Sequence, residues 1–245
     1  MAMDAQPTAP GVPAVQGRQP PLAVLLIVAV IVGVGAAAGI ATVIALRGAA
    51  DRPVTPVSLV TGQMVTQLVM IAGALAAAGW RGADRRAMLA IGPPAGGLRG
   101  YLEAIAAAVL VLGSFNLFAI YGLGHDSWAD LKPFLPIVRN DLWLLALLMI
   151  GVGAPLSEEL LFRGYLQSGL TPSRLGYWGA AVVTTLFWGI LHAGYSAIGM
   201  IEVLLIGLVF AWSVRLSGSI RPALLIHTVY NSGLTLLLKF GPVPI

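Results

Sequence analysis

The chain has 245 residues, of which 58% are hydrophobic and only 10% are charged, and its mean hydropathy is +0.89. Soluble domains carry about a quarter charged residues, so this composition excludes an ordinary soluble domain and predicts a membrane protein. The net charge of +4 does not indicate nucleic-acid binding, because the basic residues flank apolar runs instead of forming one patch. The absence of cysteine excludes disulfides, thiolate metal ligands and a thiol nucleophile.

The apolar runs predict an all-α, polytopic transmembrane helical bundle. We expect residues 1–20 to form a disordered tail, residues 21–95 to hold N-terminal transmembrane helices, and residues 96–240 to form the core. Runs near the bilayer-spanning length of about 20 residues predict about seven spans. They cover residues 22–46, 59–80, 101–123, 141–170, 177–195 and 197–214, and a last span has Pro222 in its first turn and ends at residue 238. Glycine and alanine in the first span predict close packing against another helix.

The loops between these spans differ in basic charge. With the N-terminus placed inside, the inner loops hold more basic residues than the outer ones, which agrees with the positive-inside rule. The inner set is Arg18, Arg81, Arg85, Arg86, Arg99, Arg163, Arg174, Arg215 and Arg221, and the outer set is Arg47, Arg52, Lys132, Arg139 and Lys239. We therefore expect a cytoplasmic N-terminus, and the arginine-rich, lysine-poor composition indicates a bacterial plasma membrane.

The fourth span carries two adjacent carboxylates, Glu158 and Glu159, followed by Arg163. A carboxylate in hydrocarbon costs at least about 2.5–3.5 kcal/mol, so such a group needs a partner or a function. Glu159 and Arg163 are spaced i,i+4 and can form an ion pair on a helix, whereas Glu158 points about 100° away and stays free for another role. Pro155 predicts a kink that aims Glu158 into the bundle, with Arg163 toward the cytoplasmic end of the span.

Later spans supply polar partners. His192 lies in the fifth span, nearer its opposite end, and His227 and Asn231 share one face of the last span with i,i+4 spacing. Asn116 in the third span predicts an interhelical hydrogen bond. Glu202 in the sixth span either reaches interfacial water or lines a cavity. We expect His125, in the loop of residues 124–140, to lie in solvent.

In order and spacing, these residues resemble the CPBP family of intramembrane proteases, which includes the CAAX prenyl endopeptidases. The family pattern is Glu-Glu-x-x-x-Arg, then Phe-x-x-x-His, then His-x-x-x-Asn. Glu158, Glu159 and Arg163 match the first motif, His192 the second, and His227 with Asn231 the third. One position departs, because Trp188 stands where the pattern has phenylalanine. The resemblance covers roughly residues 96–238.

The resemblance implies an intramembrane endopeptidase that hydrolyses a membrane-associated protein or peptide in the lipid bilayer. It implies that Glu158 is the general base for a water and that His192 orients this water and later donates a proton. His227 and Asn231 would form an oxyanion hole. Glu159, Arg163 and Trp188 would support this catalytic set.

Two questions remain open from sequence: whether the protein uses a metal ion, and to which class of function it belongs. Glu158, His192, His227 and Asn231 could also ligate zinc with an open position for water, although the chain has no His-Glu-x-x-His motif. Between zinc and no cofactor we favour metal-free chemistry. A non-catalytic membrane scaffold or bacteriocin-immunity protein of the same fold is the alternative function. A small transporter with a proton relay is a further one, but no inverted repeat supports it.

Overall fold

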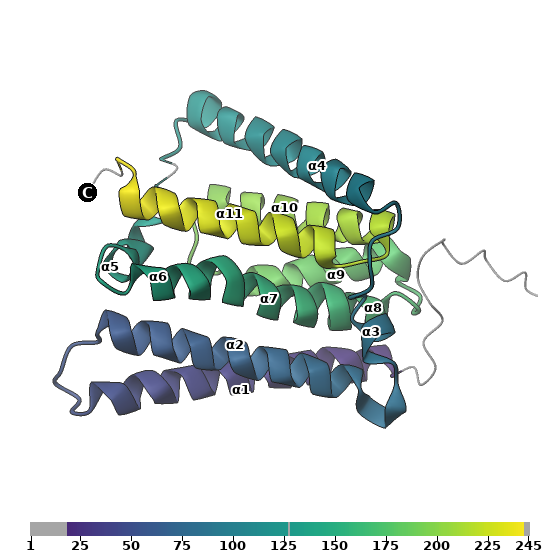
Figure 1. The fold of residues 1–245 in the computed structure, drawn as a ribbon, viewed down its shortest axis with the longest axis horizontal. Helices are drawn as coiled ribbons and strands as arrows, with labels where there is room; N and C mark the ends of the chain where they lie inside the picture. Colours follow the sequence, from purple (N-terminus) through teal and green to yellow (C-terminus); the bar gives the residue numbers. More distant parts are fainter. Residues whose placement is uncertain (1–18, 127, 243–245) are drawn as a thin grey trace, which may run out of the picture.

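The computed structural model describes residues 19–126 and 128–242, and the regular structure in this part of the chain is entirely helical (Figure 1). The disordered tail predicted for residues 1–20 falls almost wholly outside the described residues. The longer helices are α1 (Pro21–Arg47), α2 (Pro56–Ala78), α4 (Leu98–Leu117), α9 (Gly176–Ile190), α10 (Ala197–Ser217) and α11 (Arg221–Phe240). Short helices are η1 (Trp80–Gly82), α3 (Arg85–Met88), η3 (Lys132–Phe134) and α5 (Leu135–Val138), and η2 (Phe118–Gly122) continues α4.

Six helices within the described residues are long and apolar enough to cross a membrane, so the predicted polytopic helical bundle is confirmed. The segment predicted as a fifth span at residues 177–195 is shorter than expected. It forms α9, which has 15 residues and a length of about 22 Å, and residues 191–196 form turns. This length is below the roughly 30 Å of a bilayer hydrocarbon core. The protein is an integral membrane protein with six helices of spanning length and this shorter one beside them.

One long helix runs from Trp143 to Leu170 and changes its winding along the way. It consists of α6 (Trp143–Ala146), the π-helical η4 (Leu147–Gly153), α7 (Ala154–Glu158), the π-helical η5 (Glu159–Gln167) and α8 (Ser168–Leu170). In η4 the Ala154 N–H donates to the Met149 carbonyl, five residues back. Pro155 has no N–H to continue this pattern, so the Ile150 carbonyl loses its helical donor. π-Helical turns occur frequently at functional sites.

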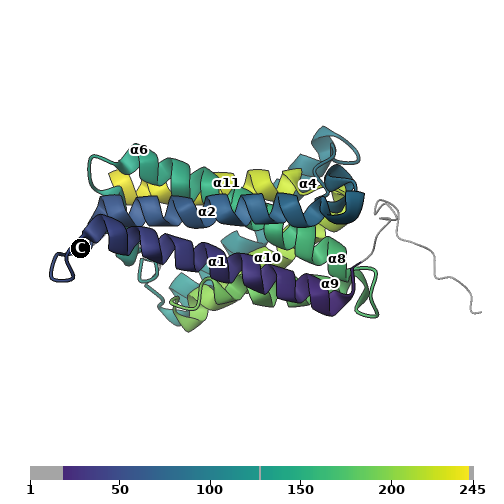
Figure 2. The ribbon, with the colours of Figure 1, turned by 90° about the horizontal axis from the view of Figure 1, so that it is seen from below.

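α1 and α2 form a closely packed pair at one edge of the bundle, and α4 lies at the opposite edge (Figure 1). A Cβ atom on Gly39 would lie 2.7 Å from the Gly62 carbonyl oxygen, so only glycine permits the observed approach of the two backbones. The close packing predicted from the Gly-rich first span is therefore present, and Figure 2 shows the two helices side by side. The Gln67 amide then joins α2 to the long helix by donating to the Met149 carbonyl at 3.1 Å.

α4 packs on α10 and α11, and the loop after η2 returns across the end of these helices. Asp126 orders this loop by accepting from the Trp128 backbone N–H at 3.0 Å and from the Lys132 ammonium at 3.1 Å. These two donors hold the pKa of Asp126 below its usual range. Asp130, further along the loop, accepts from both the backbone N–H and the hydroxyl of Ser196, the residue that caps α10. The loop is thus tied to the start of α10.

Candidate active site

Glu159 and Arg163, on η5, form the ion pair expected from their spacing. Arg163 Nη1 lies 3.3 Å from Glu159 Oε1, and both side chains are 0% exposed. The guanidinium carbon lies 4.4 Å from the centroid of the Trp188 ring and 5.2 Å from that of Phe210. Space for this stack requires Gly207 on α10, because a Cβ there would lie 3.1 Å from Arg163 Nη2. The buried cation is therefore balanced by one carboxylate and two aromatic faces.

His227, on α11, contacts both glutamates of the acidic motif. Its Nδ1 lies 3.0 Å from Glu159 Oε1, and its Nε2 lies 3.8 Å from Glu158 Oε2. Because the Glu159 carboxylate can only accept, we assign the proton to Nδ1, which leaves Nε2 of the neutral ring as an acceptor. From the spacing in the sequence, Arg163 is the one partner expected for Glu159. In the structure Glu159 also fixes the orientation and the tautomer of His227.

Glu158 ends α7, and its side chain is 13% exposed. The Trp188 indole N–H donates to Glu158 Oε2 with a nitrogen–oxygen distance of 2.5 Å. Phenylalanine, the residue in the family pattern, has no N–H and cannot make this bond. The departure at position 188 therefore keeps an aromatic ring for Arg163 and adds a donor that orients the Glu158 carboxylate.

His192 lies two residues past the end of α9, in the turn that follows it. Its Nδ1 is 3.3 Å from the Trp188 carbonyl oxygen, and its ring packs edge-on against the Trp188 indole with centroids 4.8 Å apart. His192 lies past the far end of α9, at the end opposite to the turn that joins α8 to α9. Glu158 is near the middle of the helix from Trp143 to Leu170, and because α9 is short the two residues still lie on neighbouring levels of the bundle.

Asn231 is held by the carbonyl that Pro155 leaves without a helical donor. Its Nδ2 donates to the Ile150 oxygen at 3.1 Å. The two helices approach closely there, since a Cβ on Gly151 would lie 3.2 Å from Ser232 Cα. Pro155 therefore does more than the expected kink, because it provides an acceptor that fixes the Asn231 amide. One N–H of that amide remains for another acceptor.

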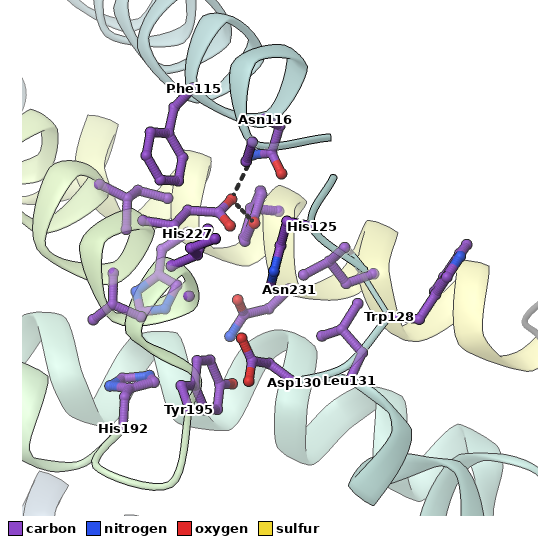
Figure 3. Close-up of a pocket in the computed structure, with 18 of the residues that line it drawn as sticks. Phe115, Asn116, His125, Trp128, Asp130, Leu131, His192, Tyr195, His227 and Asn231 are labelled. Atoms are coloured by element: carbon purple, nitrogen blue, oxygen red, sulfur yellow. Dashed lines mark hydrogen bonds between the residues drawn. The ribbon is translucent and has the colours of Figure 1, made fainter. Parts of the chain in front are cut away.

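A cavity of about 250 Å³ lies beside these residues (Figure 3). Trp188, His192, His227 and Asn231 line it, whereas Glu158 lies next to it behind Trp188 and His227. His125, expected from sequence to lie in solvent, is half-buried and lines the cavity. Glu202, for which two placements were open, also lines the cavity and accepts from Asn116 at 2.7 Å, the interhelical hydrogen bond expected for that asparagine.

Further cavity residues carried no signal in the sequence. Tyr195 and Asp130 lie in turns and loops, and Tyr230 lies on α11 between His227 and Asn231 in sequence. Tyrosine at a helix face is as common in a core as in a site, and nothing in the spacing of Asp130 relates it to Ser196. Only the folded loop after η2 brings these groups to the cavity.

The four candidate zinc ligands do not fit a preformed metal site. Within residues 19–126 and 128–242, no group of three or more histidine or acidic side chains is placed to hold a metal ion. His227 Nδ1 faces Glu159, Glu158 Oε2 accepts from Trp188, and the Asn231 amide donates to a backbone carbonyl. Zinc sites need three or four converging donors.

Comparison with known proteins gives a family match for residues 140–233. No curated protein and no solved structure gives a significant match. Residues 140–233 match the family model described as Type II CAAX prenyl endopeptidase Rce1-like. This segment contains Glu158, Glu159, Arg163, Trp188, His192, His227 and Asn231. Over residues 140–233 the chain thus matches the Rce1-like type II CAAX prenyl endopeptidases, a family of membrane proteases, and its resemblance to the CPBP family is confirmed.

Proposed function

We propose that the protein is an intramembrane endopeptidase that hydrolyses a peptide bond of a membrane-associated protein or peptide with a water activated by Glu158. One observation carries the proposal. The Glu158 carboxylate is oriented by the Trp188 N–H and lies 3.8 Å from His227 Nε2, beside a cavity that His192 and Asn231 also line. A largely enclosed carboxylate that keeps some exposure, next to an open histidine nitrogen, is a suitable general base.

The contacts of His227 change its role relative to the oxyanion donor expected from the resemblance. With its proton on Nδ1, the ring presents an acceptor toward the cavity side of Glu158. A water that donates one hydrogen to Glu158 Oε2 and the other to His227 Nε2 directs its lone pair at a substrate carbonyl. Glu159 keeps His227 in this tautomer, and Arg163 balances the charge of Glu159.

The hydrolysis then proceeds in two steps. Glu158 takes a proton from the water while the water oxygen bonds to the carbonyl carbon, and negative charge develops on the carbonyl oxygen. The N–H of Asn231 that is not engaged with Ile150 stabilises this oxyanion, a contribution of roughly 2.7–4 kcal/mol for one such donor. The C–N bond breaks as the leaving amine takes the proton from Glu158. His192 borders the cavity and assists this last transfer.

We further propose that the reaction needs no metal ion. We propose that the protein lies in a bacterial plasma membrane with its N-terminus on the cytoplasmic side. Metal-free chemistry is supported by the engagement of His227, Glu158 and Asn231 with protein partners. Loss of cleavage on treatment with EDTA, restored by one zinc per chain, would overturn this part. The substrate class proposed is a membrane-bound protein or peptide, because the cavity opens among helices of spanning length.

The test is a comparison of protein termini in cells that express wild type, Glu158→Gln or Glu103→Gln at equal levels. Glu103 is a matched control because it is another helical glutamate, bonded to Arg99 and outside the cavity lining. We expect new termini with wild type and Glu103→Gln and none with Glu158→Gln, since the amide cannot take a proton from water. Identical termini in all three, with each protein present in the membrane, would favour the non-catalytic scaffold.

A further inference from the structure

Glu202 is one of two carboxylates among the described residues that line the cavity, with Asp130, and the proposed hydrolysis uses neither. It lies on α10, and its Oε1 accepts from Asn116 Nδ2 of α4 and from the Tyr230 hydroxyl of α11, both at 2.7 Å. The dashed line from Asn116 in Figure 3 marks the first of these bonds. Both donors meet the same oxygen, so the carboxylate has a fixed orientation.

The second oxygen of Glu202 is open. In the described part of the chain, no N–H or O–H group donates to Oε2. The other acid of the lining, Asp130, differs, because the backbone N–H of Ser196 occupies one of its oxygens at 2.6 Å and the Ser196 hydroxyl occupies the other at 2.7 Å. Glu202 is therefore the carboxylate that offers a free acceptor to a molecule in the cavity.

The described residues that line the cavity include three histidines (His125, His192 and His227) but no permanently charged cation to pair with this acceptor. No lysine or arginine is among the described residues that line it, and Arg163 is paired with Glu159 outside the lining. A carboxylate in an apolar cavity gains most from a cationic donor, since charge-assisted hydrogen bonds are about twice as strong as neutral ones. The aromatic ring of Tyr195 in the same lining also favours a cation.

The position of Glu202 relates it to the proposed site of hydrolysis. Tyr230, which bonds Glu202, is three residues after His227 on α11, and residues at this spacing have Cβ atoms about 5–6 Å apart. A cavity of about 250 Å³ is smaller than the pockets of roughly 300–1,000 Å³ that enclose whole drug-sized ligands. It therefore suits a side chain that accompanies the cleaved peptide bond.

We propose that Glu202 is a specificity-determining residue that binds the lysine or arginine side chain of a substrate, within a few residues of the scissile bond. The inference rests on the proposed endopeptidase function. Asn116 and Tyr230 hold the carboxylate, and its open oxygen receives the ammonium or guanidinium group.

The first experiment compares the termini produced by wild type, Glu202→Gln, Glu103→Gln and Glu158→Gln. We expect a lysine or arginine at one fixed position near the wild-type cuts, the same preference with Glu103→Gln, and loss of this preference with Glu202→Gln. Glutamine keeps an oxygen for Asn116 and Tyr230 but removes the charge. If the termini persist with Glu158→Gln, the proposed endopeptidase function is wrong. If wild type cuts without a fixed basic residue nearby, only the proposed role of Glu202 is wrong.

The second experiment uses the purified full-length protein in liposomes and two quenched peptides built on the most abundant wild-type cut. One carries lysine at the preferred position and the other carries norleucine, which has a similar length and no charge. We expect kcat/KM to favour lysine at least 10-fold with wild type and with Glu103→Gln, a glutamate outside the cavity lining. The ratio should fall near 1 with Glu202→Gln. A wild-type ratio near 1 overturns the proposal even if Glu202→Gln does not fold.

Discussion

Glu159 links the charge balance of the site to its geometry. Its Oε1 lies 3.3 Å from Arg163 Nη1 and 3.0 Å from His227 Nδ1, so one oxygen serves a cation and a histidine. A buried guanidinium is costly without a partner, and Glu159 provides that partner while it also fixes the ring of His227. The adjacent Glu158 does not take part in this pair and instead contacts Trp188 and His227 beside the cavity. Two neighbouring glutamates thus take different roles because the helix directs them about 100° apart.

Replacement of Trp188 tests the donor that this chain has in place of the family's phenylalanine. Trp188→Phe keeps a ring beside Arg163 but removes the N–H that meets Glu158 Oε2 at 2.5 Å. A hydrogen bond to a charged group contributes about 1.5–3 kcal/mol, so we expect cleavage to slow roughly 10- to 100-fold. The measurement is the cleavage rate of purified protein on the substrate found by terminal comparison, with the melting temperature recorded in parallel.

Trp178→Phe is the matched control for this prediction. Trp178 lies on the same helix, is 51% exposed and is outside the cavity lining. It should retain the wild-type rate. A Trp188→Phe protein that cleaves as fast as wild type would show that the indole N–H does not position the base.

At the scale of elements, the long helix from Trp143 to Leu170 supplies the site through its irregular winding. A regular α-helix would satisfy the Ile150 carbonyl within the helix. The π-helical turn of η4 followed by Pro155 directs that carbonyl to Asn231 instead. The motif on α11 is therefore positioned by a proline that lies three residues before Glu158 on another helix.

Pro155→Ala tests this connection between helices. Alanine restores a backbone N–H that competes with Asn231 for the Ile150 carbonyl, and it also removes the steric conflict of proline in a helix. We expect an unchanged or higher melting temperature together with cleavage reduced about 10-fold, because the Asn231 amide loses its fixed orientation. Pro172→Ala, in the turn after α8, should change neither quantity. Full activity of the Pro155→Ala protein would show that Pro155 is not needed to position the Asn231 amide.

The outline of the fold could be predicted from sequence because hydrocarbon imposes apolar runs of fixed length. The predicted first span, residues 22–46, differs from α1 by one residue at each end. The end of α9 was missed because Leu191, Ala193 and Tyr195 continue the apolar character without a proline to mark the turn. The motif spacing identified His192, His227 and Asn231 as candidates from sequence, and in the structure all three line one cavity. The bonds from Trp188 to Glu158 and from Tyr230 to Glu202 join different helices, and no periodicity within one helix encodes them.

At the scale of the whole molecule, the outer helices present an apolar surface to the bilayer. On α1 the exposed side chains Leu22, Leu26, Val30 and Val34 recur every four residues and form one stripe. Polar groups are instead gathered around the cavity between α4, α9, α10 and α11. The protein therefore encloses polar groups and exposes apolar ones, as expected of a membrane protein.

The orientation of the chain in the membrane is testable because the sequence has no cysteine. Ala50→Cys lies between α1 and α2, and Ala95→Cys lies between α3 and α4, both at exposed positions. With a cytoplasmic N-terminus, a membrane-impermeant maleimide should label Cys at position 50 in intact cells. It should label position 95 only after permeabilisation, and the reverse pattern would invert the topology deduced from basic residues.

The short length of α9 has a consequence for the surrounding lipid. A helix of about 22 Å beside hydrocarbon of about 30 Å leaves a mismatch of roughly 8 Å, which lipid relieves by thinning at a modest cost for each ångström. The turn of residues 191–196, with His192 and Tyr195, would lie at this thinned zone. The proposed hydrolysis consumes water, and a depression in the bilayer at this point would bring the aqueous phase close to the cavity. The short helix would then give the second reactant of the proposed reaction a path to the site.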